Sequence, residues 1–118
     1  MKTPFREIAE LDRLVHDPTR LAILTALSAC GGADFLFLQR LTGLTKGNLS
    51  SHLSRLEEGG LVVIEKRVID KKPNTFVRLA DGGRAAIDAY WERLRELQEG
   101  VRTWRPSGAS GLPEPQPA

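Results

Sequence analysis

The 118-residue chain has a single cysteine, Cys30, and no apolar run long enough to cross a bilayer. One cysteine excludes an internal disulfide, and its place at the end of an apolar segment predicts a small buried filler rather than a redox-sensing thiol. Met1 leads into charged residues without the apolar segment of a signal peptide. We therefore expect a cytoplasmic protein with no membrane partner.

Metal ligands and catalytic motifs are also scarce. The two histidines, His16 and His52, have no neighbours with the spacing of metal ligands. The chain has no phosphate-binding glycine loop and no credible pairing of a nucleophile with a base. These absences argue against an enzyme, and we expect neither a metal nor another cofactor.

What remains is ordinary for a small globular protein, with 41% hydrophobic and 27% charged residues. The length suits one binding module with its own core. A net charge of +2 is only mildly basic, so the position of the charges matters more than their sum. We expect one folded domain over residues 1–104 and a disordered tail, rich in Pro, Gly and Ser, over 105–118.

Start and stop signals predict three helices in the first part of the chain. Apolar residues at helical spacing between residues 8 and 15 predict a first helix that ends near His16. Asp17, followed by Pro18, begins a second and strongly apolar helix, the expected centre of the core, which ends at the glycine pair 31–32. Asp34 caps a short third helix that closes at Gly43.

The most informative segment follows, from Thr45 to the glycine pair 59–60. Thr45 is a good N-cap and the glycines end the helix, which we place at about residues 45–58. Its leucines fall on one stripe, and the opposite face carries glycine and serine, edged by Asn48 and Arg55. Such a face approaches a DNA groove closely, and Asn and Arg form bidentate contacts with base edges. A merely solvated surface helix is the alternative.

Segments 61–69 and 75–79 are rich in β-branched residues and predict a hairpin with its turn at residues 70–74. From Glu65 to Arg78 the hairpin has five basic and two acidic residues, an excess of +3. A basic hairpin predicts a DNA-contacting wing. Alternatively, its lysines and proline only block edge pairing, and Arg78 pairs with an acid on the strand.

A long helix is predicted from Asp81, its expected cap, to about residue 102. Its apolar residues alternate at spacings of three and four, as in a dimerisation seam. Because the helix is longer than a domain of this size needs, we favour dimerisation over packing against its own domain. The expected dimer residues are Ile8, Leu11, Ile87, Tyr90, Trp91, Leu94, Leu97 and Val101.

Three stretches resemble small regulators of the MarR and ArsR families. The octapeptide Asp17-Pro18-Thr19-Arg20-Leu21-Ala22-Ile23-Leu24 looks like the opening of the second helix in ArsR-type proteins. Residues 48–62 are similar to their recognition helix, and residues 76–84 resemble the MarR strand before the dimerisation helix. The resemblance implies a mostly α fold with a small β-hairpin (α+β): a winged helix-turn-helix with a three-helix core, a wing and a long C-terminal dimerisation helix.

The resemblance further implies a homodimer whose recognition helices enter the major groove of double-stranded DNA while the wings reach the backbone or the minor groove. By carry-over, the expected DNA contacts are Thr45, Lys46, Asn48, Ser50, Ser51, His52, Arg55, Lys66, Arg67, Lys71 and Lys72. For His52, a hydrogen bond inside the domain is the alternative. The cysteine pairs and clusters of His and Asp that ArsR-type metal sensors use are missing. The resemblance allows a small-molecule effector, which the sequence does not identify. MarR proteins form their small-molecule pocket with extended terminal helices, and the first helix of this chain is short for such a pocket.

The sequence therefore predicts a sequence-specific DNA-binding transcriptional regulator, a homodimeric repressor. The rival function is a winged-helix module that binds another protein and no specific DNA. Such a module would expose aromatic or large apolar anchors on the recognition helix, where this chain has Gly, Ser and Asn.

Overall fold

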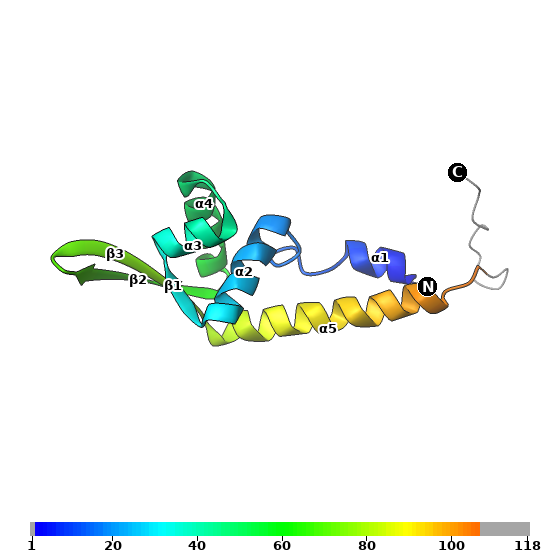
Figure 1. Cartoon of the computed structure of the whole chain (residues 1–118). Helices are drawn as coiled ribbons and strands as arrows, with labels where there is room; N and C mark the ends of the chain where they lie inside the picture. The colour runs from blue at the N-terminus through cyan, green and yellow to red at the C-terminus, as the bar shows by residue number, and fades with distance from the viewer. Residues whose placement is uncertain (1, 107–118) are drawn as a thin grey trace.

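The computed structural model describes residues 2–106, so positions 107–118 of the predicted tail lie outside the described residues. The elements in chain order are α1 (Pro4–Ala9), α2 (Pro18–Cys30), β1 (Gly32–Asp34), α3 (Phe35–Thr42), α4 (Lys46–Glu58), β2 (Val62–Ile69), β3 (Lys72–Leu79) and α5 (Asp81–Thr103). Helices α2 to α4 cluster near the start of α5, the β2–β3 hairpin projects beyond them, and α1 lies along the far part of α5 (Figure 1). The predicted fold class is confirmed. No helix in this part of the chain could span a membrane.

The ends of α2, α3 and α4 follow from local capping. The side chains of Asp17, Asp34 and Thr45 accept hydrogen bonds from the backbone N–H three residues later, at 3.0, 2.8 and 3.1 Å. Gly31 and Gly43 end α2 and α3 in the left-handed conformation, with φ of 80° and 71°. The predictions for these three helices are confirmed because each signal acts within one turn.

The sheet has three antiparallel strands in the order β1-β3-β2. Strand β1 was not predicted, because its three residues, Gly-Ala-Asp, carry no β-branched side chain. The hairpin turn consists of Asp70 and Lys71 alone, between the paired residues Ile69 and Lys72. Both turn residues have positive φ, 51° and 65°, as a two-residue hairpin turn of type I′ requires. The predicted five-residue turn was therefore too long.

One hydrophobic core joins the helices to the sheet. Helix α2 is at its centre, packed against α3, α4, α5, β1 and β3. The largest fully buried side chains of the core are Ile23, Leu24, Leu27, Leu38, Leu49, Leu56, Ile87, Val15 and Val77. The leucines of α4 lie in this core, so its other face is left to solvent.

Three further local predictions were wrong. Helix α1 ends at Ala9, and the segment before α2 forms turns in which Asp12 accepts the N–H of Leu14 at 2.9 Å. Apolar residues of this segment enter the core from turns and only imitate helical spacing. Cys30 is exposed, since the buried side of α2 ends at Leu27. The cap of α5 is Ala80, which supplies no side-chain hydrogen bond, and Asp81 is already helical.

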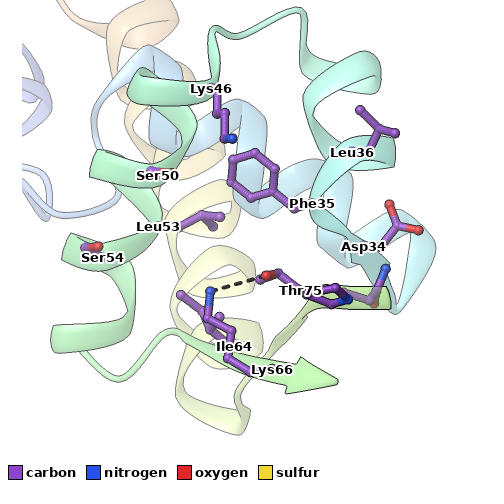
Figure 2. A pocket seen from close by; sticks show the side chains of 12 residues that line it. Asp34, Phe35, Leu36, Lys46, Ser50, Leu53, Ser54, Ile64, Lys66 and Thr75 are labelled. Carbon is purple, nitrogen blue, oxygen red and sulfur yellow. Dashed lines mark hydrogen bonds between the residues drawn. The ribbon is translucent and has the colours of Figure 1, made fainter. Parts of the chain in front are cut away.

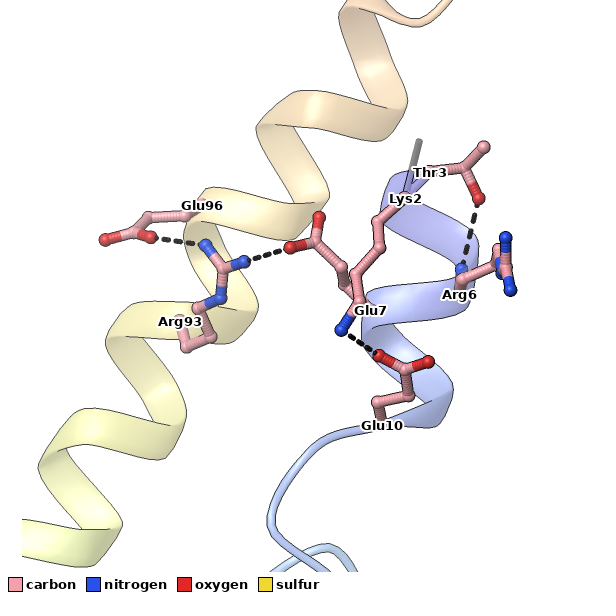
Figure 3. Close-up of polar contacts among 7 residues, drawn as sticks. All are labelled: Lys2, Thr3, Arg6, Glu7, Glu10, Arg93 and Glu96. Atoms are coloured by element: carbon pink, nitrogen blue, oxygen red, sulfur yellow. Dashed lines mark hydrogen bonds and ion pairs between the residues drawn. The ribbon is translucent and has the colours of Figure 1, made fainter. Parts of the chain in front are cut away.

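Helix α1 packs along the C-terminal part of α5. Arg93 of α5 donates to Glu7 of α1 at 2.6 Å and to Glu96 at 2.9 Å, as Figure 3 shows. The rings of Phe5 and Trp104 meet edge to face with centroids 5.2 Å apart. The chain thus covers part of the apolar side of its own long helix.

This packing changes what is available for dimerisation. Ile87, Tyr90 and Leu97, three of the predicted dimer residues, are buried within the chain itself, as is Leu11. Packing of the helix on its own domain, the alternative, therefore accounts for these four. Trp91 is 38% exposed, and Ile8, Leu94 and Val101 are partly exposed. The prediction of a dimer rests on these latter residues.

Candidate nucleic-acid interface

Helices α3 and α4 form the helix-turn-helix, joined by the three residues 43–45. Leu49, Leu53 and Leu56 anchor α4 in the core. The remaining residues of α4 are exposed, apart from half-buried His52. Because the outer side chains are short or polar, this face can approach another molecule closely.

A groove of about 510 Å³ separates α4 from the hairpin and α3 (Figure 2). Lys46, Ser50 and Ser54 line its α4 side, and Lys66 with Thr75 lines the hairpin side. Nζ of Lys66 donates to the hydroxyl of Thr75 at 3.2 Å. The lining between the two lysines is largely apolar, with Phe35, Leu53 and Ile64, and Asp34 adds a carboxylate. The lysines and hydroxyl groups at the rim can contact a sugar-phosphate backbone that passes along the groove.

The opposite flank of α4 carries Asn48, His52 and Arg55. Asn48 and Arg55 are exposed. His52 is held by the domain, because its Nδ1 lies 3.2 Å from Nη1 of Arg20 on α2. The hydrogen bond inside the domain, the alternative for His52, is thus confirmed.

Arg20 is the residue near the interface that sequence reasoning missed. It is only 8% exposed, although its side chain is charged. Nε donates to the carbonyl of Leu14 at 2.7 Å and Nη2 to that of Arg13 at 3.1 Å. The sequence could have indicated this role, because Arg20 lies on the same helical stripe as the buried residues 23, 24 and 27. A charged side chain on a buried stripe needs hydrogen-bond partners.

Asp17 completes this cluster. Its carboxylate accepts the backbone N–H of Arg20 and lies 3.9 Å from the guanidinium nitrogen Nη2. That backbone hydrogen bond, supported by the positive charge of Arg20, lowers the pKa of Asp17 below its ordinary value, against an opposing effect of burial. Asp17 therefore stays ionised and caps α2 with a full charge.

The hairpin carries the remaining predicted contacts. Lys71 and Lys72 are exposed at its tip. The guanidinium of Arg67 lies 4.0 Å from the ring centroid of Phe76, and Nε of Arg78 donates to Glu65 at 3.0 Å. The ion pair with an acid on the strand, the alternative for Arg78, is confirmed.

The structure thus divides the predicted contacts among four places. Lys46, Ser50 and Lys66 lie at the groove, while Asn48, His52 and Arg55 lie on the far flank of α4. Ser51 is exposed on the outer face, and Arg67, Lys71 and Lys72 lie along the hairpin. Thr45 differs from the others because its hydroxyl oxygen already accepts the N–H of Asn48.

A sequence profile described as a winged helix DNA-binding domain matches residues 19–98, from the first turn of α2 nearly to the end of α5. The chain belongs to this family, and the β2–β3 hairpin is its wing. Within the class, its fold is that of the MarR-like transcriptional regulators. The predicted MarR-like winged helix is thereby confirmed.

Individual proteins resemble this chain over most of its length. The chain is 30% identical over 89 residues to an uncharacterized protein of Methanocaldococcus jannaschii, a match covering 75% of this chain and 97% of that protein. A transcriptional regulator homologue from Pyrococcus horikoshii superposes with a TM-score of 0.75 at 32% identity, over 83% of this chain and 96% of that one. A MarR-family regulator from Silicibacter pomeroyi shares the fold, with a TM-score of 0.58 at 23% identity over 92% and 70% of the two chains.

Proposed function

We propose that this protein is a homodimeric, sequence-specific transcriptional repressor that places α4 in the major groove of double-stranded DNA. The observation that carries the proposal is the outer face of α4, which has no large apolar side chain, has Gly47, Ser51 and Ser54 at its centre, and is bordered by a groove with a lysine on each side. A major groove admits an α-helix, and short side chains let the helix axis come close to the base edges.

Each part of the interface has a chemical role in this proposal. Asn48 and Arg55 contact base edges, because their side chains form bidentate hydrogen bonds with adenine and guanine. Lys46, Ser50 and Lys66 contact phosphates along the groove between α4 and the hairpin, and Ser51 contacts DNA from the outer face of α4. The wing, with Arg67, Lys71 and Lys72, follows the backbone or enters the minor groove. Thr45 offers its hydroxyl hydrogen to a phosphate while its oxygen caps α4.

Dimerisation through α5 completes the proposal. Trp91 on α5 is 38% exposed, and Leu94 and Val101 of the same helix are partly exposed, as is Ile8 of α1. Apolar side chains in such numbers along one long helix favour a second copy as the covering surface. A two-fold dimer would read two half-sites about one helical turn apart, roughly 34–36 Å.

The experiment is fluorescence anisotropy of the protein with a duplex from upstream of its own gene and with a shuffled duplex of the same composition. Both titrations are repeated over a salt series. We expect tighter binding to the upstream duplex. The logarithm of the association constant should fall linearly with the logarithm of the salt concentration, with a slope of about 0.9 for each of several phosphate contacts. Absence of binding to either duplex at low salt would contradict the proposal and favour a protein partner.

The rival function, a protein-binding module, requires large apolar anchors on the outer face of α4. That face has none between Lys46 and Glu58, the bounds of the helix. We therefore retain the DNA-binding proposal alone.

A further inference from the structure

The contact between Arg20 and His52 also determines which ring nitrogen of His52 carries hydrogen. An arginine side chain carries only hydrogen-bond donors and stays charged in proteins. Its Nη1 can therefore bond Nδ1 of His52, 3.2 Å away, only if Nδ1 accepts and carries no proton. A neutral imidazole whose Nδ1 is an acceptor has its hydrogen on Nε2.

Arg20 is rigid enough to impose this choice. Its guanidinium is planar, and two further bonds, to the carbonyls of Arg13 and Leu14 at 3.1 and 2.7 Å, fix the orientation of that plane. The side chain is nearly enclosed, with 8% of the residue exposed. Nη1 is thereby directed toward α4 from a largely buried side chain.

The other nitrogen of His52 is open to a partner. Among residues 2–106, Nδ1 of His52 is hydrogen-bonded to Arg20, whereas Nε2 has no hydrogen-bond partner. Nε2 is also not enclosed by the protein, unlike the unpaired Oδ1 of Asn74. His52 lies between the buried leucines of α4 and its outer face, and it is half-buried. The Nε2 hydrogen is therefore within reach of a molecule bound along that flank.

We propose that Arg20 is a positioning residue that keeps Nδ1 of His52 as a hydrogen-bond acceptor and leaves the ring hydrogen on Nε2, so that His52 meets DNA as a single hydrogen-bond donor. This inference rests on the proposed function, because it needs α4 to lie on DNA. The acceptor is a phosphate oxygen, since His52 lies at the edge of α4 and not at the centre of its outer face, and backbone contacts border the base contacts.

The first test uses the protein without DNA. Nitrogen-15 NMR of the imidazole distinguishes protonated from unprotonated ring nitrogens, and we expect Nδ1 of His52 to be unprotonated and Nε2 protonated at neutral pH. Arg20→Met removes the donor but retains the apolar stem, and it should give a mixture of the two neutral forms. A wild-type His52 that is protonated on Nδ1 overturns the proposal, and so does an unchanged proton distribution in Arg20→Met.

A second pair of variants keeps Arg20 and decides the question even where Arg20→Met fails to fold. The amide nitrogen of Gln reaches the position of Nε2, whereas that of Asn reaches the position of Nδ1. We expect His52→Gln to bind the upstream duplex within about threefold of the wild type and His52→Asn to bind on the order of tenfold more weakly, the effect of losing a hydrogen bond to a charged group. Equal binding by both variants overturns the DNA contact.

The two experiments distinguish a failure of the proposed function from a failure of the role of Arg20. A wild-type protein that binds neither duplex at low salt contradicts the proposed function, whatever the NMR result. A wild type that binds DNA while its His52 carries hydrogen on Nδ1 contradicts the role of Arg20 alone.

Discussion

Nδ1 of His16 lies 2.8 Å from the hydroxyl of Tyr90, and the two rings are 5.7 Å apart between centroids. This contact attaches the turns before α2 to the middle of α5. Tyr90 is consequently 6% exposed, although its spacing along the helix favoured a role between two copies. Its neighbour Trp91 packs edge to face on it at 5.4 Å and is 38% exposed.

The dimer is therefore best tested at Trp91. A charge at Leu97, which is 3% exposed, would disturb the fold of one chain as much as any contact between chains. We expect Trp91→Glu to give monomers by sedimentation or light scattering while the thermal midpoint changes little. Gln98→Glu, which adds the same charge at an exposed position on α5, should leave the dimer intact. A Trp91→Glu protein that remains dimeric would show that α5 serves its own domain only.

Arg55→Ala should reduce discrimination between the upstream and shuffled duplexes. Loss of one bidentate base contact costs about 1–3 kcal/mol on the specific sequence and less on other sequences. Arg95→Ala removes the same charge from an exposed position on α5 and should preserve the preference. Parallel anisotropy titrations of both variants measure the ratio. Similar losses on both duplexes for Arg55→Ala would mean that Arg55 contacts the backbone.

The wing lysines should contribute affinity without sequence preference. Lys71→Gly combined with Lys72→Gln removes two charges and keeps the turn, because φ of residue 71 is 65°, a value that glycine adopts readily. We expect both duplexes to bind more weakly and the salt slope to fall by about 2. As a control, Lys2→Gln removes a lysine paired with Glu10 and should not alter the slope. An unchanged slope in the double variant would remove the wing tip from the interface.

Gly83 should be intolerant of any side chain. It is buried in the first turns of α5, and a Cβ there would collide with the carbonyl oxygen of Leu61. That oxygen also accepts the N–H of Ala80 at 3.0 Å, so it has little freedom to move. We expect Gly83→Ala to lower the free energy of unfolding by about 1–3 kcal/mol in urea titrations.

Gly100→Ala is the matched control on the same helix. Its Cβ would meet the Cβ of Pro4 at 3.5 Å, an ordinary contact. Alanine favours a helix interior over glycine by up to about 1 kcal/mol, so this variant should be neutral or more stable. Equal destabilisation by the two substitutions would contradict the steric explanation for Gly83.

Asp17 should make stability depend on pH in the acid range. Its pKa is lowered from an ordinary value of 3.8, chiefly by the backbone N–H of Arg20. A carboxyl group whose pKa is lowered in the folded state stabilises the protein at pH values above its ordinary pKa. This contribution is lost as the pH falls through the pKa of the folded state. Asp17→Asn keeps a capping oxygen without the charge. We expect the wild type to be the more stable protein at pH 7, with a difference that shrinks below about pH 4; a difference independent of pH would contradict this account.

The sequence predicted best those features that depend on a few neighbouring residues. Caps such as Asp34 and Thr45 and the glycines after α2 and α3 determine where helices begin and end within one turn. Strand β1 and the exposure of Cys30 depend on tertiary packing, and no local signal carries that information. Arg20 was missed because two of its partners are backbone carbonyls, which a pattern of side chains does not reveal.

Asp34 has two structural duties, since it is both the last residue of β1, paired with Phe76 of the wing, and the N-cap of α3. The wing and the helix-turn-helix are consequently joined through the backbone of one residue. If this connection limits the movement of the wing relative to the helix-turn-helix, the protein requires a certain distance between the major groove and the DNA backbone beside it. We expect the protein to favour operators whose flanking sequence narrows or bends at low cost, and so to sense the deformability of DNA at base pairs that it never touches.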